Sequence, residues 1–360
     1  MVWFHKDTAW AIGIICNRQL SNSKAKYLLQ PLSFPFHHPP THIKDEDAIR
    51  PWLAWTLPVP THARLANSLY DEVPWERVLQ GEFGTDGDTE VDASILGAKA
   101  VEVGYTFFDR LPSPEGEIFY SGMFLGAEKL WVGDPVRLRL PTIAVLVIQQ
   151  LAEKKTGFPG MNPEIVGDIY EFVEIPVPFV GDMQWPIDQG LPARMAADLL
   201  FRREVALKAK HGIWCEWKLV ERNAHKGLND IIGRWYETRT VMPVLRGADY
   251  YRDLEKGLTS DVTKWMNGRG ESNNGMNQRM KDRIECLGRA VPHGLTISRG
   301  LNGPPRESVF LIERQQHPAN QMTDNGPYVP GTGQVEQDLD QFMNLDHVAD
   351  QTFYDNTMQK

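Results

Sequence analysis

Few cysteines are present in the sequence, and none is paired. Cys16, Cys215 and Cys286 lie far apart in a chain of 360 residues. Structural zinc sites and disulfide frameworks both need cysteines at short, recurring spacings, so the sequence predicts neither. Isolated cysteines are typical of a reducing compartment, which is the nucleus or the cytoplasm.

Long apolar runs and an excess of positive charge are also lacking. The run AWAIGIIC is too short to span a bilayer and is followed by the polar stretch NRQLSNSKAK, so we expect neither a membrane segment nor a secretory signal. The formal net charge of -9 excludes a protein that coats nucleic acid through a net basic field. A local basic patch is still compatible with this charge.

Common catalytic motifs are missing as well. The chain contains no GxSxG, GxxxxGK, HExxH or GxGxxG, and no HxE followed by PCxxC. Two carboxylate pairs, Asp168 with Glu171 and Asp230 with Glu237, could act as acid and base. They stand beside glycine-containing turns, where carboxylates more often stabilise the turn. We therefore predict a protein that is not an enzyme and needs no cofactor.

One histidine cluster and one acidic run have features of metal sites without meeting their requirements. His37, His38 and His42 are separated by prolines and lack a nearby cysteine, so we interpret them as a surface loop. In EFGTDGDTEVDASILG the acids from Asp86 onward alternate as in a calcium loop, but Val91 stands where that loop needs glycine. We interpret this stretch as a solvated acidic linker and predict no metal site.

Composition divides the chain into four regions. Residues 1–94 are rich in proline, tryptophan and histidine and are expected to be partly ordered. Residues 95–246 have the residue pattern of β-strands, which begins at about Ala93. In residues 247–312 the apolar residues have the spacing of helices. Residues 313–360 are rich in Gln, Asn and Asp without periodicity, which is typical of a disordered tail.

The strand VRLRL alternates apolar and basic side chains. Val136, Leu138 and Leu140 would share one face, and Arg137 and Arg139 the other. This period of two is typical of a half-buried strand.

Further strands follow at short intervals. IAVLVIQQL is apolar without alternation, as in a central strand, and VGDIYEFVEI and IWCEWKLVE alternate. DIIGRWYETRTVMPVL would be a last strand or pair closed by Pro243. A helix is expected over about 192–210 because that stretch has helix-forming composition. The fold class is therefore mainly β with α additions (α+β), built on a partly closed β-barrel.

The region after Gly247 has the spacing of amphipathic helices. Ser260 would cap one of them, and MKDRIECLGRA predicts a further short helix. The apolar residues at three- and four-residue spacing are Tyr251, Leu254, Leu258, Val262 and Trp265.

Four segments together are similar to a known family. FLGAEKLWVGDPVRLR, then VLVIQQL, VGDIYEFVEI and GRWYETRTVMPVL resemble the fungal transcription-silencing family named cryptic loci regulator, second member. The resemblance covers residues 95–246 well and RPWLAWTLPVPTHARLANSL more loosely.

The resemblance implies a BAH-like (bromo-adjacent homology) domain in a non-catalytic scaffold subunit. In the family, that subunit belongs to SHREC, a nuclear repressor complex that joins a histone deacetylase with a remodeller and silences heterochromatin. Its partners would be other subunits of that complex, together with a histone tail or nucleosomal DNA as alternatives. A reader of modified histone tails and a small-molecule enzyme that uses the Asp168 and Glu171 region are the competing hypotheses.

An aromatic group and a basic group are the candidate recognition residues. Trp214, Trp217, Trp235 and Tyr236 could contribute to a cage for a methylated lysine. Neighbouring positions on a strand point to opposite faces, so the alternative is that these rings form part of the core.

The basic group lies at the end of the predicted helix. Arg202, Arg203, Lys208 and Lys210 could contact DNA phosphates, or they could simply form a solvated helix face. A third way to bind a partner is strand addition at an exposed sheet edge, for which VGDIYEFVE is the candidate.

Overall fold

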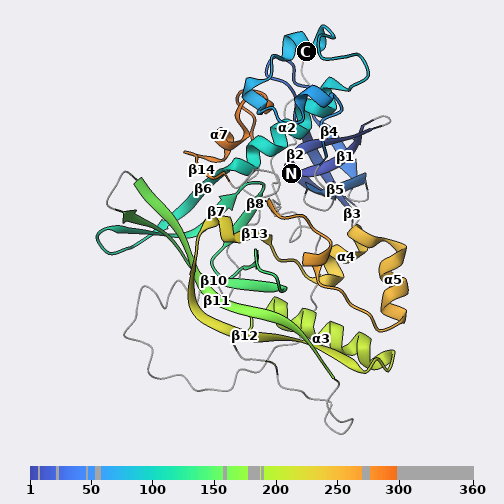
Figure 1. The fold of residues 1–360 in the computed structure, drawn as a ribbon, viewed down its shortest axis with the longest axis vertical. Helices are drawn as coiled ribbons and strands as arrows, with labels where there is room; N and C mark the ends of the chain where they lie inside the picture. Colours follow the sequence, from blue (N-terminus) through green and yellow to red (C-terminus); the bar gives the residue numbers. More distant parts are fainter. Residues whose placement is uncertain are drawn as a thin grey trace, which may run out of the picture.

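The computed structural model describes residues 1–6, 9–21, 24–45, 48–52, 58–156, 160–176, 187, 190–269 and 276–297. Two sheets, antiparallel except for the parallel pair of β6 (Gly104–Leu111) and β14 (Gln278–Arg279), are joined by helices that lie between and around them (Figure 1). This confirms the expected class, mainly β with α additions, and the larger sheet curls into a half-barrel. None of the helices within these ranges is long and apolar enough to cross a membrane.

The N-terminal sheet has five strands in the order β4-β3-β2-β1-β5. Sequence reasoning did not predict it, because AWAIGIIC does not alternate. In the structure this run is buried on both faces: Ala11 and Ile15 lie in a small core of the N-terminal sheet, and Ile12 and Ile14 lie in the main core. The strands are β1 (Val2–Lys6), β2 (Ala9–Ser21), β3 (Lys24–Pro31), β4 (His42–Asp45) and β5 (Ile49–Pro51).

A helical connection follows the N-terminal sheet, and its main element corrects two predictions. The stretch expected as an acidic linker contains an N-cap, since the Asp88 side chain accepts hydrogen bonds from the backbone N–H groups of Glu90 and Val91 at 2.9 and 3.0 Å. The expected strand texture from Ala93 is likewise wrong, because residues 89–103 are helical. The elements are η3 (Ala63–Leu65), η4 (Tyr70–Glu72), α1 (Trp75–Leu79) and α2 (Thr89–Val103).

The half-barrel follows the strand order β12-β11-β10-β7-β6-β14. β10 is long enough to pair with β9 through its first half and with β7 through its second half, so the sheet bends around β10. The strands are β6 (Gly104–Leu111), β7 (Glu117–Leu125), β8 (Glu128–Trp131), β9 (Pro135–Leu138), β10 (Ala144–Thr156), β11 (Gly160–Pro176), β12 (Ile213–Lys226), β13 (Ile231–Arg234) and β14 (Gln278–Arg279).

Long periodic segments of the half-barrel match their predictions, and the last predicted strand does not. IAVLVIQQL lies in β10, VGDIYEFVEI in β11 and IWCEWKLVE in β12, and α3 (Ala193–Lys208) is the predicted helix. The last strand ends at Arg234, and α4 (Thr238–Arg246) follows with Pro243 inside it. The strand-like residues of α4 are overridden because its apolar side, including Val241 and Met242, packs in the core.

The region after Gly247 forms a shorter helix than predicted, because α5 (Ala248–Glu255) ends after two turns. Tyr251, Leu258 and Trp265 are 57%, 43% and 40% exposed, so they do not form the expected buried face. Asp261 rather than Ser260 is the cap. The remaining elements are η5 (Leu228–Asp230), η6 (Val262–Lys264), α7 (Arg283–Leu287) and η7 (Gly288–Ala290).

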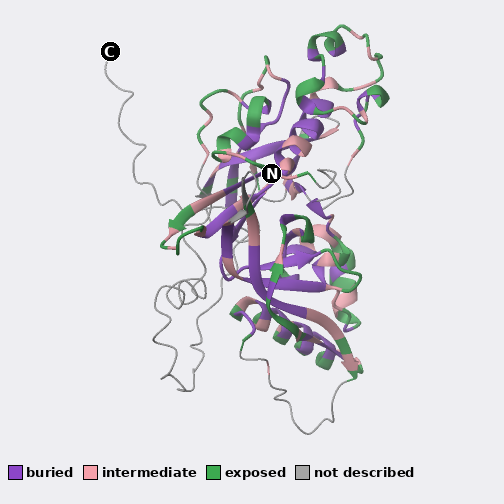
Figure 2. Ribbon diagram, turned by 60° about the vertical axis from the view of Figure 1, so that its left-hand side comes forward, coloured by how far each residue is buried: buried purple, intermediate pink, exposed green. Residues whose placement is uncertain are grey.

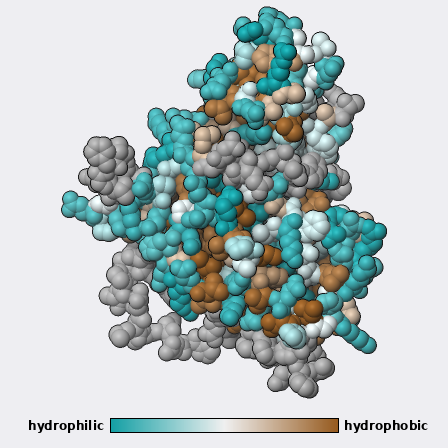
Figure 3. Space-filling view, in the orientation of Figure 1, coloured by the Kyte–Doolittle hydropathy of each residue, from teal (hydrophilic) through white to brown (hydrophobic). Residues whose placement is uncertain are grey.

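One continuous apolar core joins the two sheets, as the buried strands and helices in Figure 2 show. α2 packs against β2, α7 and η7, and the Ser94 hydroxyl accepts a hydrogen bond from the Ile12 N–H at 3.2 Å. α2 spans the boundary that composition suggested after residue 94, and the predicted tail at 313–360 lies outside the described residues. On the face seen in Figure 3, apolar residues gather over the half-barrel strands and α3.

Candidate functional site

The charged residues of the two family-like motifs meet inside the half-barrel. β9 and β13 pair so that Val136 lies opposite Arg234, which brings GAEKLWVGDPVRLR beside GRWYE. Asp134 is fully buried and receives hydrogen bonds from Arg234 Nη2 at 2.9 Å and from Arg194 Nη1 at 3.0 Å. Because Arg194 also binds Glu237 at 2.6 Å, one helix residue connects both motifs. We call this set of buried ion pairs the motif network.

Glu128 is the third acid of the motif network, after Asp134 and Glu237. Its Oε2 accepts a hydrogen bond from the Arg234 N–H at 2.6 Å, and its Oε1 accepts one from the Tyr236 hydroxyl at 2.8 Å. Burial, together with the charge of Glu128, raises the pKa of Tyr236 well above its ordinary value. For Glu237, burial opposes ionisation, but the neighbouring Arg194 outweighs it, and the pKa of Glu237 is lowered. These groups hold fixed charges and a fixed proton, which suits structure better than proton transfer.

Arg137 was predicted to lie on a solvated face, and this prediction is wrong. The side chain is 0% exposed, and its guanidinium donates to the backbone carbonyls of Arg234 at 3.0 Å and Asn267 at 3.1 Å. It therefore connects β13 to the segment after η6. Gly233 permits this approach, because a Cβ there would lie 2.5 Å from Arg137 Nη2, and its φ is +142°. Leu140, expected on the buried face, is 46% exposed.

A second buried cluster contains half of the basic residues proposed for DNA. Arg202 is 1% exposed and forms ion pairs with Asp198 at 2.6 Å and Asp261 at 3.1 Å. Arg203 is 4% exposed, and its guanidinium lies 5.2 Å from the Trp214 ring centroid. Both arginines therefore belong to the core. The helical period of the sequence could not reveal that these arginines are buried, because it does not show which side of α3 the sheet covers.

The two lysines of the same candidate group lie on the opposite side. Lys208 and Lys210 are exposed, and Lys208 forms an ion pair with Glu204 at one helical turn. The four residues thus do not form one basic surface. Phosphate contact by the lysines stays a prediction.

The four candidate aromatic residues are packed in the interior. Trp214, Trp217, Trp235 and Tyr236 are 3%, 2%, 0% and 4% exposed. Trp217 and Trp235 meet edge to face at 6.0 Å, and the Trp235 Nε1 donates to Asp261 at 3.0 Å. This packing favours the alternative that the sequence allowed, in which the rings form part of the core.

The carboxylate pairs considered for catalysis have structural partners. Asp168 Oδ1 accepts the Asn223 N–H at 2.9 Å, and Asp230 Oδ2 accepts the Gly227 N–H at 2.9 Å. Within the described part of the chain, no group of three or more His, Cys, Asp or Glu side chains could hold a metal ion. His37 instead stacks on Phe34 at 5.5 Å.

Glu102 connects α2 to the half-barrel. Its side chain accepts the Ala127 N–H at 3.0 Å and lies 3.8 Å from Arg269. Burial raises the pKa of Glu102 from 4.5 to about 7, although Arg269 acts in the opposite direction. Gly126 is needed beside it, because a Cβ there would lie 2.2 Å from Glu102 Oε2. Sequence reasoning missed Glu102, since a single glutamate in an apolar helix has no distinctive spacing.

β12 is the terminal strand of the half-barrel sheet, whereas the predicted edge β11 pairs with β10 and β12. The prediction that VGDIYEFVE forms an edge is therefore wrong. Along residues 218–223 of β12, every side chain is exposed except Leu219, which is half-buried. Val220 is 50% exposed and lies at a register shift in the pairing with β11. β12 thus presents its apolar Val220 on an accessible edge segment.

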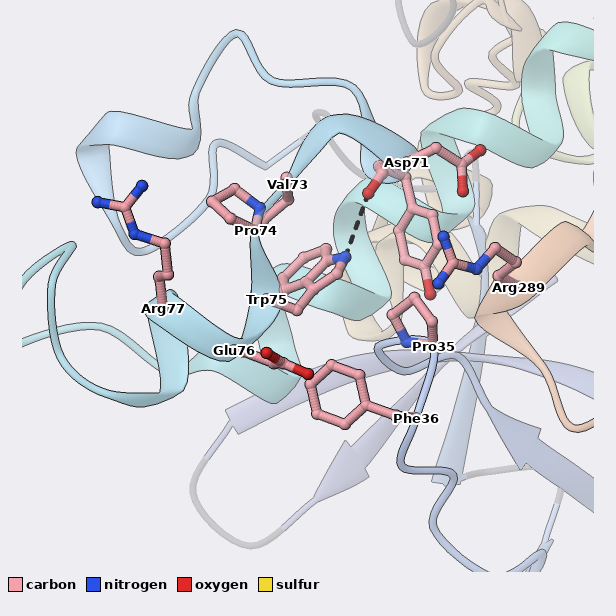
Figure 4. A pocket seen from close by; sticks show the side chains of 10 residues that line it. Pro35, Phe36, Asp71, Val73, Pro74, Trp75, Glu76, Arg77 and Arg289 are labelled. Carbon is pink, nitrogen blue, oxygen red and sulfur yellow. Dashed lines mark hydrogen bonds between the residues drawn. The ribbon is translucent and has the colours of Figure 1, made fainter.

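A pocket of about 300 Å³ lies between the loop that follows β3 and the η4–α1 segment (Figure 4). Phe36, Trp75 and two prolines form apolar walls, and charged side chains surround them. Figure 4 shows the Glu76 carboxylate between the Trp75 indole and the Phe36 ring, whereas Arg77 points away from them. The lining residues are Pro35, Phe36, Tyr70, Asp71, Val73, Pro74, Trp75, Glu76, Arg77 and Arg289.

Comparison with known proteins agrees with the motif resemblance. Residues 119–237 match the family model described as transcription-silencing protein Clr2. One similar solved structure is described as Clr2 bound to the Clr1 C-terminus. It has 13% identity and a TM-score of 0.41, and the match covers 88% of this chain and 60% of that one. This likeness is too distant to assign contacts, and no curated protein matches the chain.

The matched range contains every residue named in the motif network, because both motifs, the strands that pair them and Arg194 lie within it. Residues 119–237, about a third of the chain, are therefore similar to the Clr2 family of transcription-silencing proteins.

Proposed function

We propose that this protein is a non-catalytic scaffold subunit of a nuclear chromatin-silencing complex of the SHREC type. In such a complex it would hold a histone deacetylase and a remodeller together in heterochromatic gene silencing. The observation that carries the proposal is the match of residues 119–237 to a family of transcription-silencing proteins. A nuclear location follows from that role.

The motif network supports a structural role over a catalytic one. General acid–base catalysis needs a group that can exchange a proton with a substrate. Asp134 and Glu237 are 0% and 2% exposed, and both are ion-paired. Because both carboxylates already have buried arginine partners, they fix the relative positions of β9, β13 and α3. These contacts give the half-barrel a rigid shape.

The edge of β12 is the surface we propose for a partner subunit. An extended segment can add to a terminal strand through main-chain hydrogen bonds, with side-chain contacts supplying specificity. Val220 supplies an apolar contact there, and Lys218 and Arg222 supply charges. The register shift at Val220 also hinders indiscriminate pairing between copies of the edge.

Affinity capture from nuclear extract with matched variants tests this proposal. Val220→Asp introduces a charge at a half-exposed site of the β12 edge, and Leu200→Asp introduces the same charge on α3, where Leu200 is 56% exposed. We expect the wild type and Leu200→Asp to recover a deacetylase and a remodeller, and Val220→Asp to lose them. Recovery of neither enzyme by the wild type contradicts the scaffold role. Equal recovery by both variants contradicts the proposal that partners bind at the β12 edge, but leaves the scaffold role standing.

A defined probe completes the test. The C-terminal segment of Clr1, which is bound in the solved Clr2 structure, can be titrated against the purified chain. Hydrogen exchange of residues 213–226 should slow on binding if the segment adds to β12. Slowed exchange confined to the N-terminal sheet would place the contact elsewhere.

A further inference from the structure

We infer that the pocket between Phe36 and Trp75 binds a cationic side chain of a basic peptide segment in a partner protein. This inference does not depend on the scaffold role or on the β12 edge, because it concerns another part of the molecule. It rests on the shape of the pocket, on the rigidity of its walls and on the charge around it.

The aromatic walls are held in place before any ligand arrives. The Trp75 ring lies 5.5 Å from the Tyr70 ring, and its Nε1 donates to the Tyr70 carbonyl at 3.2 Å. The Tyr70 hydroxyl in turn donates to the Ser33 carbonyl at 2.5 Å. Phe36 packs on Phe34 at 5.1 Å and is itself 54% exposed. Phe36 therefore presents a large apolar surface to solvent on a wall that does not need to reorganise.

The polar groups at this end of the pocket select the sign of the ligand charge. Glu76 is exposed, and Figure 4 shows its carboxylate beside the Phe36 ring. Arg77 does not neutralise Glu76, because Arg77 binds Glu82 at 2.6 Å. Arg289 lines a different part of the pocket from Glu76 and Phe36 in Figure 4. Trp75 is only 3% exposed and serves as support, so the exposed Phe36 ring and the Glu76 carboxylate are the groups that attract an ammonium or guanidinium group.

The surrounding segment strengthens this selection. Residues 58–92 contain eight acidic residues and two arginines, a formal charge of -6, whereas the whole chain carries -9. A peptide with several basic residues would be drawn to this segment from a distance. Nucleic acid would be repelled by it. The acidic residues are Asp71, Glu72, Glu76, Glu82, Asp86, Asp88, Glu90 and Asp92.

The segment is anchored to the rest of the protein, so the pocket keeps its position. The buried His62 ring nitrogen Nδ1 lies 2.7 Å from Asp92 Oδ2, and the His62 N–H donates to the same oxygen at 3.0 Å. Asp92 belongs to α2, which packs on the N-terminal sheet. The pocket is thus a fixed feature of the fold.

Peptide binding to the full chain tests the inference. The probe is a short, unstructured, fluorescently labelled peptide of alternating lysine and glycine, and its glutamate–glycine counterpart is the control ligand. We expect the basic peptide to bind and the acidic one not to, with affinity that falls as salt rises. Equal binding of the two peptides would overturn the inference.

Matched variants separate the pocket from diffuse charge. Phe36→Ala and Glu76→Gln should each lower the affinity for the basic peptide by about two- to fivefold, which is the usual contribution of one cation–π or exposed charge contact. Leu79→Ala and Glu72→Gln are the controls, because both residues are exposed in the same segment and neither lines the pocket. Equal weakening by Glu72→Gln and Glu76→Gln would mean that the segment attracts peptides only through its total charge, which refutes the site. Unchanged denaturation midpoints would confirm that each variant is folded.

Discussion

The two sheets of this protein are stabilised by different kinds of contact. The small core of the N-terminal sheet consists of apolar and aromatic side chains such as Phe4, Tyr27 and Leu29. The half-barrel encloses buried charges, among them Asp134, with arginine partners on β13 and α3. Apolar cores tolerate many substitutions of similar volume, whereas a buried charge needs a particular partner in a particular place. The half-barrel therefore depends on particular charge partners in addition to an apolar core of its own.

The largest expected effect comes from breaking the motif network. Asp134→Ala removes the acceptor shared by Arg234 and Arg194, so that each buried guanidinium group loses one charged partner, although Arg194 keeps Glu237. We expect the free energy of unfolding to fall by about 3–5 kcal/mol, measured by chemical denaturation. The control is Glu82→Ala in the N-terminal half, which removes an exposed ion pair with Arg77 and should cost about 0–1 kcal/mol. Similar losses in the two variants would contradict the contrast between the regions.

The contact between the regions should depend on pH through Glu102. Its pKa is about 7 in the folded protein and 4.5 in the unfolded chain, so the folded state binds the proton more tightly. The stabilisation from this group is present below pH 4.5 and is lost as pH rises through about 7, a change of about 3 kcal/mol.

Glu102→Gln should remove this contribution while keeping an acceptor for the Ala127 N–H. Denaturation midpoints of the wild type and the variant should therefore converge at low pH, with the wild type the less stable protein above pH 7. A difference between them that is constant over this range would show that Glu102 does not titrate there.

Glycine substitutions sharpen the comparison by separating strain from close approach. Gly233 and Gly84 have φ of +142° and +116°, but a Cβ at Gly84 meets nothing within 4 Å, whereas one at Gly233 meets Arg137. Both alanine variants incur backbone strain of about 1–3 kcal/mol. In the same denaturation assay, Gly233→Ala should lower the free energy of unfolding more than Gly84→Ala does. Equal losses would mean that the Arg137 side chain moves aside without cost.

The smallest effect is expected on the outer face of α3. Lys208 pairs with Glu204 across one turn, and both side chains are largely exposed. Lys208→Ala should change the free energy of unfolding by about 0.3–0.5 kcal/mol, less at high salt. A loss above that of Gly84→Ala would show that this face of α3 is not a free surface.

Sequence reasoning succeeded where periodicity and burial agree. β10 is covered on both faces and β11 alternates, and both were identified from their residues. It failed for β2, because burial on both faces erased the alternation that marks a strand. It also failed for α4, whose Thr, Val and Pro residues favour a strand or turn locally, while packing of Val241 and Met242 selects a helix.

The candidate sites were missed for a related reason. Arg137 was expected on the polar face of a half-buried strand, and Arg202 on a helix face that contacts DNA or solvent, because charged residues are rarely buried without partners. Those partners lie far away in the sequence, at Asn267 for Arg137 and at Asp261 for Arg202. Phe36 and Glu76 belong to segments with no common motif, and only the packing of Trp75 on Phe34, in the loop after β3, brings them to one pocket.

The sequence by itself determined the fold class, the family resemblance of residues 119–237 and the long strands and helix of the half-barrel, because local periodicity and the spacing of motif residues are properties of the chain. Tertiary structure decided which charges are buried, which strand is the edge and where a pocket opens. Each of these depends on contacts between residues that are distant in the sequence, and a pattern of neighbouring residues does not record such contacts.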